Sequence, residues 1–185
     1  MIVLLLLLLG VALGLLAWLF AAHPRVEMIT AGISLGCLLG AGLWQLFVHR
    51  ELHHHALQVS LPLAAGLLAV VGGGPATAVV LRWVDREQAA SAGEHQQETL
   101  EAAAEHLRGG AWIGAFERLA VAASLLLGWP EGVAVALAIK AFGRYPELKS
   151  PGGAAAERFI IGTFTSVLWA AGCSGVAVLT LNSRG

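Results

Sequence analysis

The sequence predicts an all-α membrane protein, a polytopic bundle of about six transmembrane helices. Hydrophobic residues make up 57% of the 185 positions, and the mean hydropathy is +0.75. Charged residues account for only 12%, about half of the roughly 25% that is usual in soluble domains. Apolar runs repeatedly approach the roughly 20 residues that a helix needs to cross about 30 Å of hydrocarbon. Residues 1–185 are therefore expected to form a single membrane domain.

The first two spans are predicted from two apolar runs, each ended by a short polar group. Ile2–Ala22 is followed by His23-Pro24-Arg25, and Met28–Val48 is followed by His49-Arg50-Glu51. The first run has no positively charged start and no A-x-A cleavage site, and it is longer than the apolar part of a signal peptide. We expect it to be a retained membrane helix.

The third span, Ala56–Leu81, contains Pro62 and the sequence Gly72-Gly73-Gly74-Pro75. Glycine and proline both disfavour a continuous helix, so this span is predicted to break near Gly72–Gly74. Transporters use broken helices to build ion and substrate sites. A simple glycine-proline kink is the alternative.

A polar stretch, residues 82–109, follows the third span. Glu94–Arg108 contains strong helix formers and neither proline nor glycine, and its apolar residues recur at helical spacing. We expect a cytoplasmic amphipathic helix. It is either a solvated helix or a docking face for a basic partner.

The remaining spans are predicted at Gly110–Trp129, at Glu131–Tyr145, which is short, and at Phe159–Leu181. Loops rich in Arg and Lys stay on the cytoplasmic side of a membrane. With the N-terminus outside, seven of these residues are inside and two, Arg50 and Arg184, are outside. The sequence thus predicts a multi-pass protein of a bacterial cytoplasmic membrane with both termini outside.

Small residues at a spacing of four indicate close helix packing, because lipid provides no hydrophobic force between helices. Such patterns occur at Gly32, Gly36 and Gly40, at Gly110 and Gly114, and at Gly162, Ser166 and Ala170. The pattern does not distinguish packing within the chain from packing between copies of it.

Charged residues inside the predicted spans point to an internal polar site. Glu117 and Arg118 lie about two turns into the fourth span, where a charge costs about 2.5–3.5 kcal/mol unless it faces the bundle and finds a partner. We expect both to face the interior, near Gly162–Ser166. At the same depth, the fifth and sixth spans contribute further ionisable and hydroxyl groups. The predicted site comprises Glu117, Arg118, Lys140, Arg144, Glu157, Arg158, Thr163 and Ser166.

A structural role for these residues is the alternative. Lys140, Arg144 and Arg158 lie near helix ends, from which long side chains reach the membrane surface. Glu117 and Arg118 can equally belong to an ion-pair network that holds helices together.

Other features of the sequence give weaker indications. His49 and His53 are four residues apart and are weak candidates for a metal site, in a segment otherwise typical of a polar loop. Cys37 and Cys173 lie in apolar runs, which does not favour a disulfide.

No nucleotide, zinc-protease or serine-hydrolase motif occurs, and no cofactor is expected. A net charge of −1 does not favour a nucleic-acid partner.

Short motifs between Trp112 and Ala170 carry a resemblance to a known group of proteins. They are Gly114 with Glu117-Arg118, Ile139-Lys140, Arg144-Tyr145-Pro146-Glu147-Leu148, and Glu157-Arg158 with Ile161-Gly162-Thr163 and Ser166. In this last third, the chain resembles a group of small, uncharacterised actinobacterial integral membrane proteins. The resemblance implies a membrane location and no particular activity.

The sequence favours a non-enzymatic protein, either a channel- or transporter-like bundle or the membrane subunit of an assembly, with an internal site for an anionic guest. One alternative is a membrane-embedded enzyme acting on an anionic lipid, with the basic residues holding phosphate and Glu117 as acid or base. Another is a scaffold whose charges lock the helices. The expected partners are the bilayer, an anionic lipid or solute, and a second copy or another membrane protein.

Overall fold

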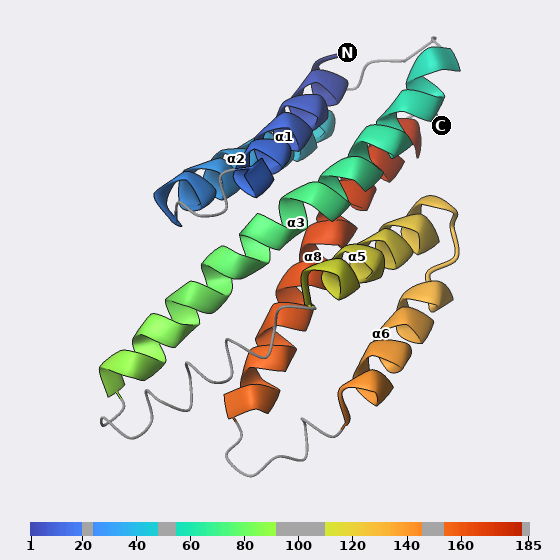
Figure 1. Ribbon diagram of the computed structural model, residues 1–185. Helices are drawn as coiled ribbons and strands as arrows, with labels where there is room; N and C mark the ends of the chain where they lie inside the picture. The colour runs from blue at the N-terminus through green and yellow to red at the C-terminus, as the bar shows by residue number, and fades with distance from the viewer. Residues whose placement is uncertain (20–23, 48–54, 92–109, 146–153, 183–185) are drawn as a thin grey trace.

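The computed structural model describes residues 1–19, 24–47, 55–91, 110–145 and 154–182. The described residues form six α-helices and no strand, which confirms the all-α prediction. In chain order the helices are α1 (Ile2–Leu19), α2 (Pro24–Phe47), α3 (His55–Ser91), α5 (Gly110–Leu126), α6 (Glu131–Gly143) and α8 (Ala154–Asn182) (Figure 1).

Four of these helices, α1, α2, α3 and α8, are long and apolar enough to cross a membrane. Helix α5 has 17 residues and α6 has 13. At about 1.5 Å per residue, both are shorter than the roughly 30 Å of a hydrocarbon core. Six full spans therefore remain a prediction, and the expected shortness of the fifth segment agrees with α6.

Helix α3 is the centre of the bundle. It contacts α1, α2, α5 and α8, and its largest interface is with α8. The α1–α2 pair lies on one side of α3, and the α5–α6 pair lies on the other (Figure 1). This arrangement lets side chains from three different helices reach one turn of α3.

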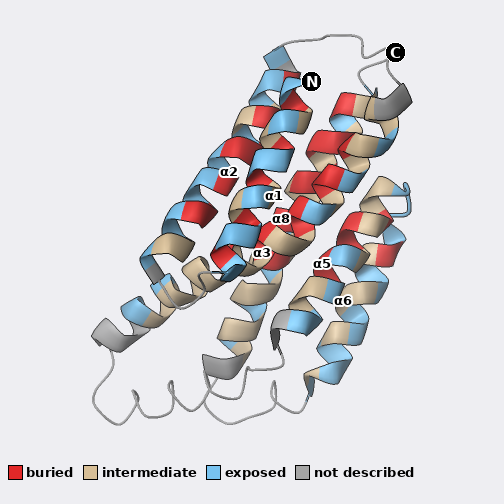
Figure 2. Cartoon of the chain, turned by 45° about the horizontal axis from the view of Figure 1, so that its top comes forward, coloured by how far each residue is buried: buried red, intermediate tan, exposed pale blue. Residues whose placement is uncertain are grey.

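The interior consists largely of small side chains. Ala65 and Ala69 of α3 and Ala170 and Ala177 of α8 are fully buried, as is Ala41 of α2. Buried residues face inward and exposed ones outward along each helix (Figure 2). The outward faces carry large apolar side chains, including Leu5, Leu39, Phe164 and Leu168. So much exposed apolar surface is unusual for a protein in water and suits a lipid environment.

The predicted break in the third span is wrong: α3 is one continuous helix through Pro62 and Pro75. It also runs into the predicted polar stretch as far as Ser91, while residues 92–109, which include the expected amphipathic helix, lie outside the described part of the chain. In lipid, a broken helix would leave backbone N–H and carbonyl groups without hydrogen-bond partners. Where a proline removes one backbone donor, a neighbouring helix can supply another, so the helix can stay continuous.

The partner for the carbonyl freed by Pro75 comes from α1. Proline has no N–H, so the carbonyl of Val71, four residues earlier, loses its usual donor. The indole Nε1 of Trp18 donates a hydrogen bond of 3.3 Å to this oxygen. The continuity of α3 is therefore supported by a tertiary contact.

Replacing Trp18 by phenylalanine is expected to lower the free energy of unfolding by about 1 kcal/mol, because the Val71 carbonyl then loses its donor. In a Pro75→Ala background the cost should be smaller, since that replacement restores the missing backbone N–H. Unfolding of the four variants in detergent micelles, followed by circular dichroism, measures the coupling. An equal cost of the Trp18 replacement in both backgrounds would contradict this role.

The small-residue patterns differ in what they pack against. A Cβ added to Gly32, Gly36 or Gly40 would meet nothing within 4 Å, so this face of α2 packs against no other described helix of the chain. Gly162 of α8 does face α3, since a Cβ added there would lie 3.6 Å from Cδ1 of Leu81. Close helix approaches also involve Gly14 of α1, which the patterns did not include, and the glycines at 72 and 73.

Candidate functional site

Three side chains from three helices converge on one turn of α3, at Gly72, Gly73 and Gly74, which we call the glycine notch. Trp169 of α8 donates from Nε1 to the carbonyl of Leu68 at 3.1 Å. Arg118 of α5 donates from Nε to the carbonyl of Val70 at 3.1 Å. With the Trp18 bond, three contacts between helices each end on a carbonyl of α3.

The glycines make this approach possible. A Cβ on Gly72 would lie 2.7 Å from Cζ2 of Trp169, and one on Gly73 would lie 2.9 Å from Cδ1 of the same ring and closer still to Cδ of Arg118. Any side chain at these two positions would force the arginine and the indole away. The glycines predicted to break α3 instead provide room for two bulky partners.

Arg118 is only 4% exposed, so a positively charged side chain is buried in the interior of the bundle. Val70 accepts its Nε hydrogen bond, and no described residue accepts one from its two Nη nitrogens. Within the described chain, no carboxylate lies at ion-pairing distance from it. Its charge therefore has no direct counter-ion among these residues, although Glu117 is its neighbour in sequence.

Glu117 pairs with Lys140 of α6, through Oε2 and Nζ. The glutamate side chain is 4% exposed and the lysine side chain 18%. The other carboxylate oxygen, Oε1, is buried and has no hydrogen-bond partner among the described residues. The Lys140 ammonium also lies 5.4 Å from the centre of the Phe159 ring on α8, a favourable cation–π geometry. The pair thus joins α5, α6 and α8.

The other charged residues of the predicted site lie apart from the Glu117–Lys140 pair. Arg158 of α8 pairs with Asp85 of α3, so its charge is compensated. Glu157 is exposed, and Arg144 is half-buried with an interaction of its own. These residues lie where α6 ends and α8 begins, and they do not join the buried pair.

Thr163 and Ser166 of α8 lie within the bundle, and their hydroxyl oxygens are buried without a hydrogen-bond partner in the described chain. Most other described hydroxyls in the spans donate to a carbonyl of their own helix, as Thr165 does to Ile161 at 2.8 Å. Since buried polar atoms are nearly always hydrogen-bonded, the two oxygens retain capacity for a polar guest. The α8 residue that lies against Gly73 together with Arg118 is Trp169, about one turn beyond the predicted Gly162–Ser166 segment.

The structure adds residues that the predicted site does not include. Trp18 and Trp169 lie in the first and last apolar runs of the sequence, and a tryptophan in a membrane helix carries an N–H that needs an acceptor. Asp85 and Glu27 were absent from the predicted site, and they neutralise Arg158 and Arg82. Their pairing partners lie 73 and 55 residues away in sequence, which no local pattern reveals.

His49 and His53 lie outside the described residues. Both cysteines are buried and unpaired, as expected. Comparisons of the chain with protein-family models, with curated proteins and with solved structures found no match.

Proposed function

We propose that this protein is a channel- or transporter-like membrane bundle whose internal polar site binds a small anion. The observation that carries the proposal is Arg118, which is buried and has no carboxylate partner among the described residues. A charge in the middle of a membrane domain is costly and is usually kept for a function.

The charge balance around Arg118 favours an anion. Lys140 is neutralised by Glu117, and Arg158 by Asp85, which leaves the guanidinium as the excess charge. Guanidinium N–H groups form strong, directional hydrogen bonds to anions, and the Nη donors are not used by described residues. The unpartnered hydroxyls of Thr163 and Ser166 offer further donors on α8.

Anion flux into liposomes tests the proposal. Purified protein in phosphatidylcholine vesicles is expected to pass at least one of chloride, nitrate or phosphate faster than empty vesicles do. Arg118→Gln should abolish the flux, and Arg118→Lys, which keeps the charge, should retain part of it. Arg25→Gln removes an exposed arginine of α2 and serves as the matched control.

Two results would contradict the proposal. One is the absence of flux of all three anions with folded wild-type protein. The other is unchanged flux in Arg118→Gln. Because this variant also loses the bond to Val70, its unfolding temperature is measured in parallel to separate loss of transport from loss of fold.

A structural role is the second candidate, and the three hydrogen bonds to α3 carbonyls just before the glycine notch favour it. In that case Arg118 only locks α5 against α3. A stable, folded protein without flux, in which Arg118→Gln lowers the unfolding temperature, is the result expected of a scaffold.

We also propose that the protein lies in a bacterial cytoplasmic membrane with both termini outside. The start of α1 and the end of α8 lie at the same end of the bundle (Figure 1). The α5–α6 pair enters and leaves on one side, so counting it as two spans or as a re-entrant hairpin gives the same orientation. Arg25, Arg82 and Arg86 then face the cytoplasm, as the positive-inside rule requires.

Single cysteines test this orientation. Ile2→Cys is expected to react with a membrane-impermeant maleimide in intact cells, and Arg86→Cys only after permeabilisation. The wild type, whose two cysteines are buried, provides the background. Labelling of Arg86→Cys in intact cells would reverse the assignment.

A further inference from the structure

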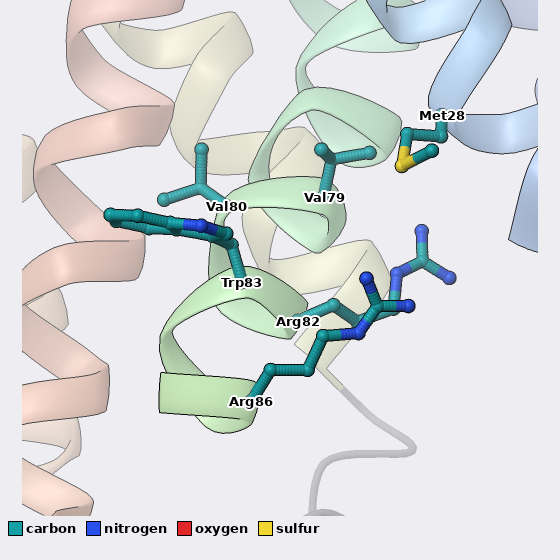
Figure 3. A pocket seen from close by; sticks show the side chains of 6 residues that line it. All are labelled: Met28, Val79, Val80, Arg82, Trp83 and Arg86. Atoms are coloured by element: carbon teal, nitrogen blue, oxygen red, sulfur yellow. The ribbon is translucent and has the colours of Figure 1, made fainter. Parts of the chain in front are cut away.

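A second basic feature lies at the C-terminal end of α3, away from the buried Arg118. Here α3 and the start of α2 border an open pocket of about 250 Å³, which is lined by Met28, Val79, Val80, Arg82, Trp83 and Arg86. Figure 3 shows the side chains of Arg82 and Arg86 extending to the same side of α3, below Met28. The pocket is open to the outside of the bundle and none of its residues belongs to the predicted site.

The α3 residues of the pocket form one side of the helix. Val79, Arg82 and Arg86 are three or four residues apart, so they succeed one another along the helix surface. Val80 and Trp83 continue the pocket on the adjacent strip of α3 (Figure 3). Apolar side chains thus lie toward the membrane interior and guanidinium groups toward its surface. This polarity matches an amphipathic occupant.

The charges of this pocket are only partly compensated. Arg82 pairs with Glu27 at 2.5 Å, and its side chain is still 36% exposed. Arg86 is exposed, and no described residue pairs with it. Among the neighbouring charged groups, Arg25 is exposed, Asp85 is held by Arg158, and Glu87 has an interaction of its own. The pocket therefore retains a positive charge.

Trp83 indicates the depth of the pocket. Its side chain is 61% exposed, beside two arginines and at the end of an apolar span. Tryptophan concentrates at the membrane–water interface, where the headgroups of lipids lie. Basic pockets between membrane helices at this level are suited to anionic headgroups.

We propose that this pocket binds an anionic phospholipid. Arg86 and the exposed edge of Arg82 hold the headgroup phosphate, and an acyl chain runs along Val79, Val80 and Met28. The apolar wall favours a lipid over a soluble anion, because a free phosphate would leave that surface uncovered. The proposal is independent of anion transport through Arg118.

Native mass spectrometry of the full chain, released from detergent with added lipid, measures the binding. We expect phosphatidylglycerol to bind more tightly than phosphatidylcholine of the same chain length. Arg86→Gln should weaken the phosphatidylglycerol complex by about tenfold, as expected for the loss of one charge-assisted hydrogen bond. Arg82→Gln combined with Glu27→Gln, which leaves no stranded carboxylate, should weaken it similarly.

Arg25→Gln is the matched control, because it removes an exposed arginine at the same end of the bundle that does not line the pocket. It should change the affinity by less than about twofold. Circular dichroism and elution volume establish that each variant is folded.

Three outcomes would overturn the proposal. The first is equal binding of the two lipids by the wild type. The second is an equal loss in Arg25→Gln and Arg86→Gln, which would indicate a diffuse charge effect. The third is inorganic phosphate binding alone, in lipid-free detergent, with the same dependence on Arg86, which would make the ligand a soluble anion.

Discussion

Lys140→Met is expected to destabilise the protein by about 3–5 kcal/mol, because it leaves the carboxylate of Glu117 buried without its counter-ion. The glutamate side chain is only 4% exposed, so water cannot replace the ammonium. Glu117→Gln should cost less, since Lys140 is 18% exposed and a long side chain can turn toward the membrane surface. The double variant, in which neither charge remains, should be more stable than Lys140→Met alone.

The free energy of unfolding in detergent micelles, measured for all four variants, gives the coupling between the two residues. Glu157→Gln makes the same chemical change at an exposed position of α8 and should alter stability by less than about 0.5 kcal/mol. Small, additive effects of the two single replacements would show that the ion pair contributes nothing to the packing of α5 against α6.

Gly73→Ala is expected to destabilise the bundle by about 1–3 kcal/mol, through overpacking of a filled interior. The added methyl group would come within 2.9 Å of the Trp169 ring and closer to Arg118. Neither partner can withdraw freely, because each donates a hydrogen bond to an α3 carbonyl. Both bonds should therefore weaken together.

Gly32→Ala is the matched control, since it makes the same change in an apolar helix where nothing lies within 4 Å of the new methyl group. Alanine is the better helix former, so this variant should be unchanged or more stable by up to about 1 kcal/mol. Unfolding midpoints of the two variants are compared under one detergent condition. A shift of the same sign and size in both would show that the notch is not tightly packed.

The helices could be predicted from the sequence because hydropathy over about 20 residues is a local property. The ends of α1, α2 and α8 fall within a few residues of the predicted spans. The continuity of α3 could not be predicted in this way. Whether Pro75 breaks a helix depends on a donor to the Val71 carbonyl, and that donor, Trp18, is 53 residues away.

The same holds for the candidate site: its charged residues could be predicted from the sequence, but their partners could not. Glu117 and Arg118 stand out because charges are rare in apolar runs, and the structure buries both. Their partners depend on helix packing. Adjacent in sequence, the two residues point to different neighbours, Glu117 to Lys140 on α6 and Arg118 to the carbonyl of Val70 on α3. Arg144 and Glu157 belong to the predicted site as well, but Arg144 is half-buried, Glu157 is exposed, and neither joins the buried pair.

The buried alanines of α3 and α8 have a consequence for how the helices associate. An alanine side chain has no rotamers to lose when it is buried, whereas a leucine loses about 0.5–1 kcal/mol of conformational entropy. In lipid, helix association gains little from the removal of apolar surface from the solvent. Ala65 and Ala69 of α3 and Ala170 and Ala177 of α8 are all fully buried, so their packing costs no side-chain entropy. Dispersion between closely packed atoms can then exceed the small entropy that these side chains lose, so alanines contribute to the packing of the bundle although each buries little surface.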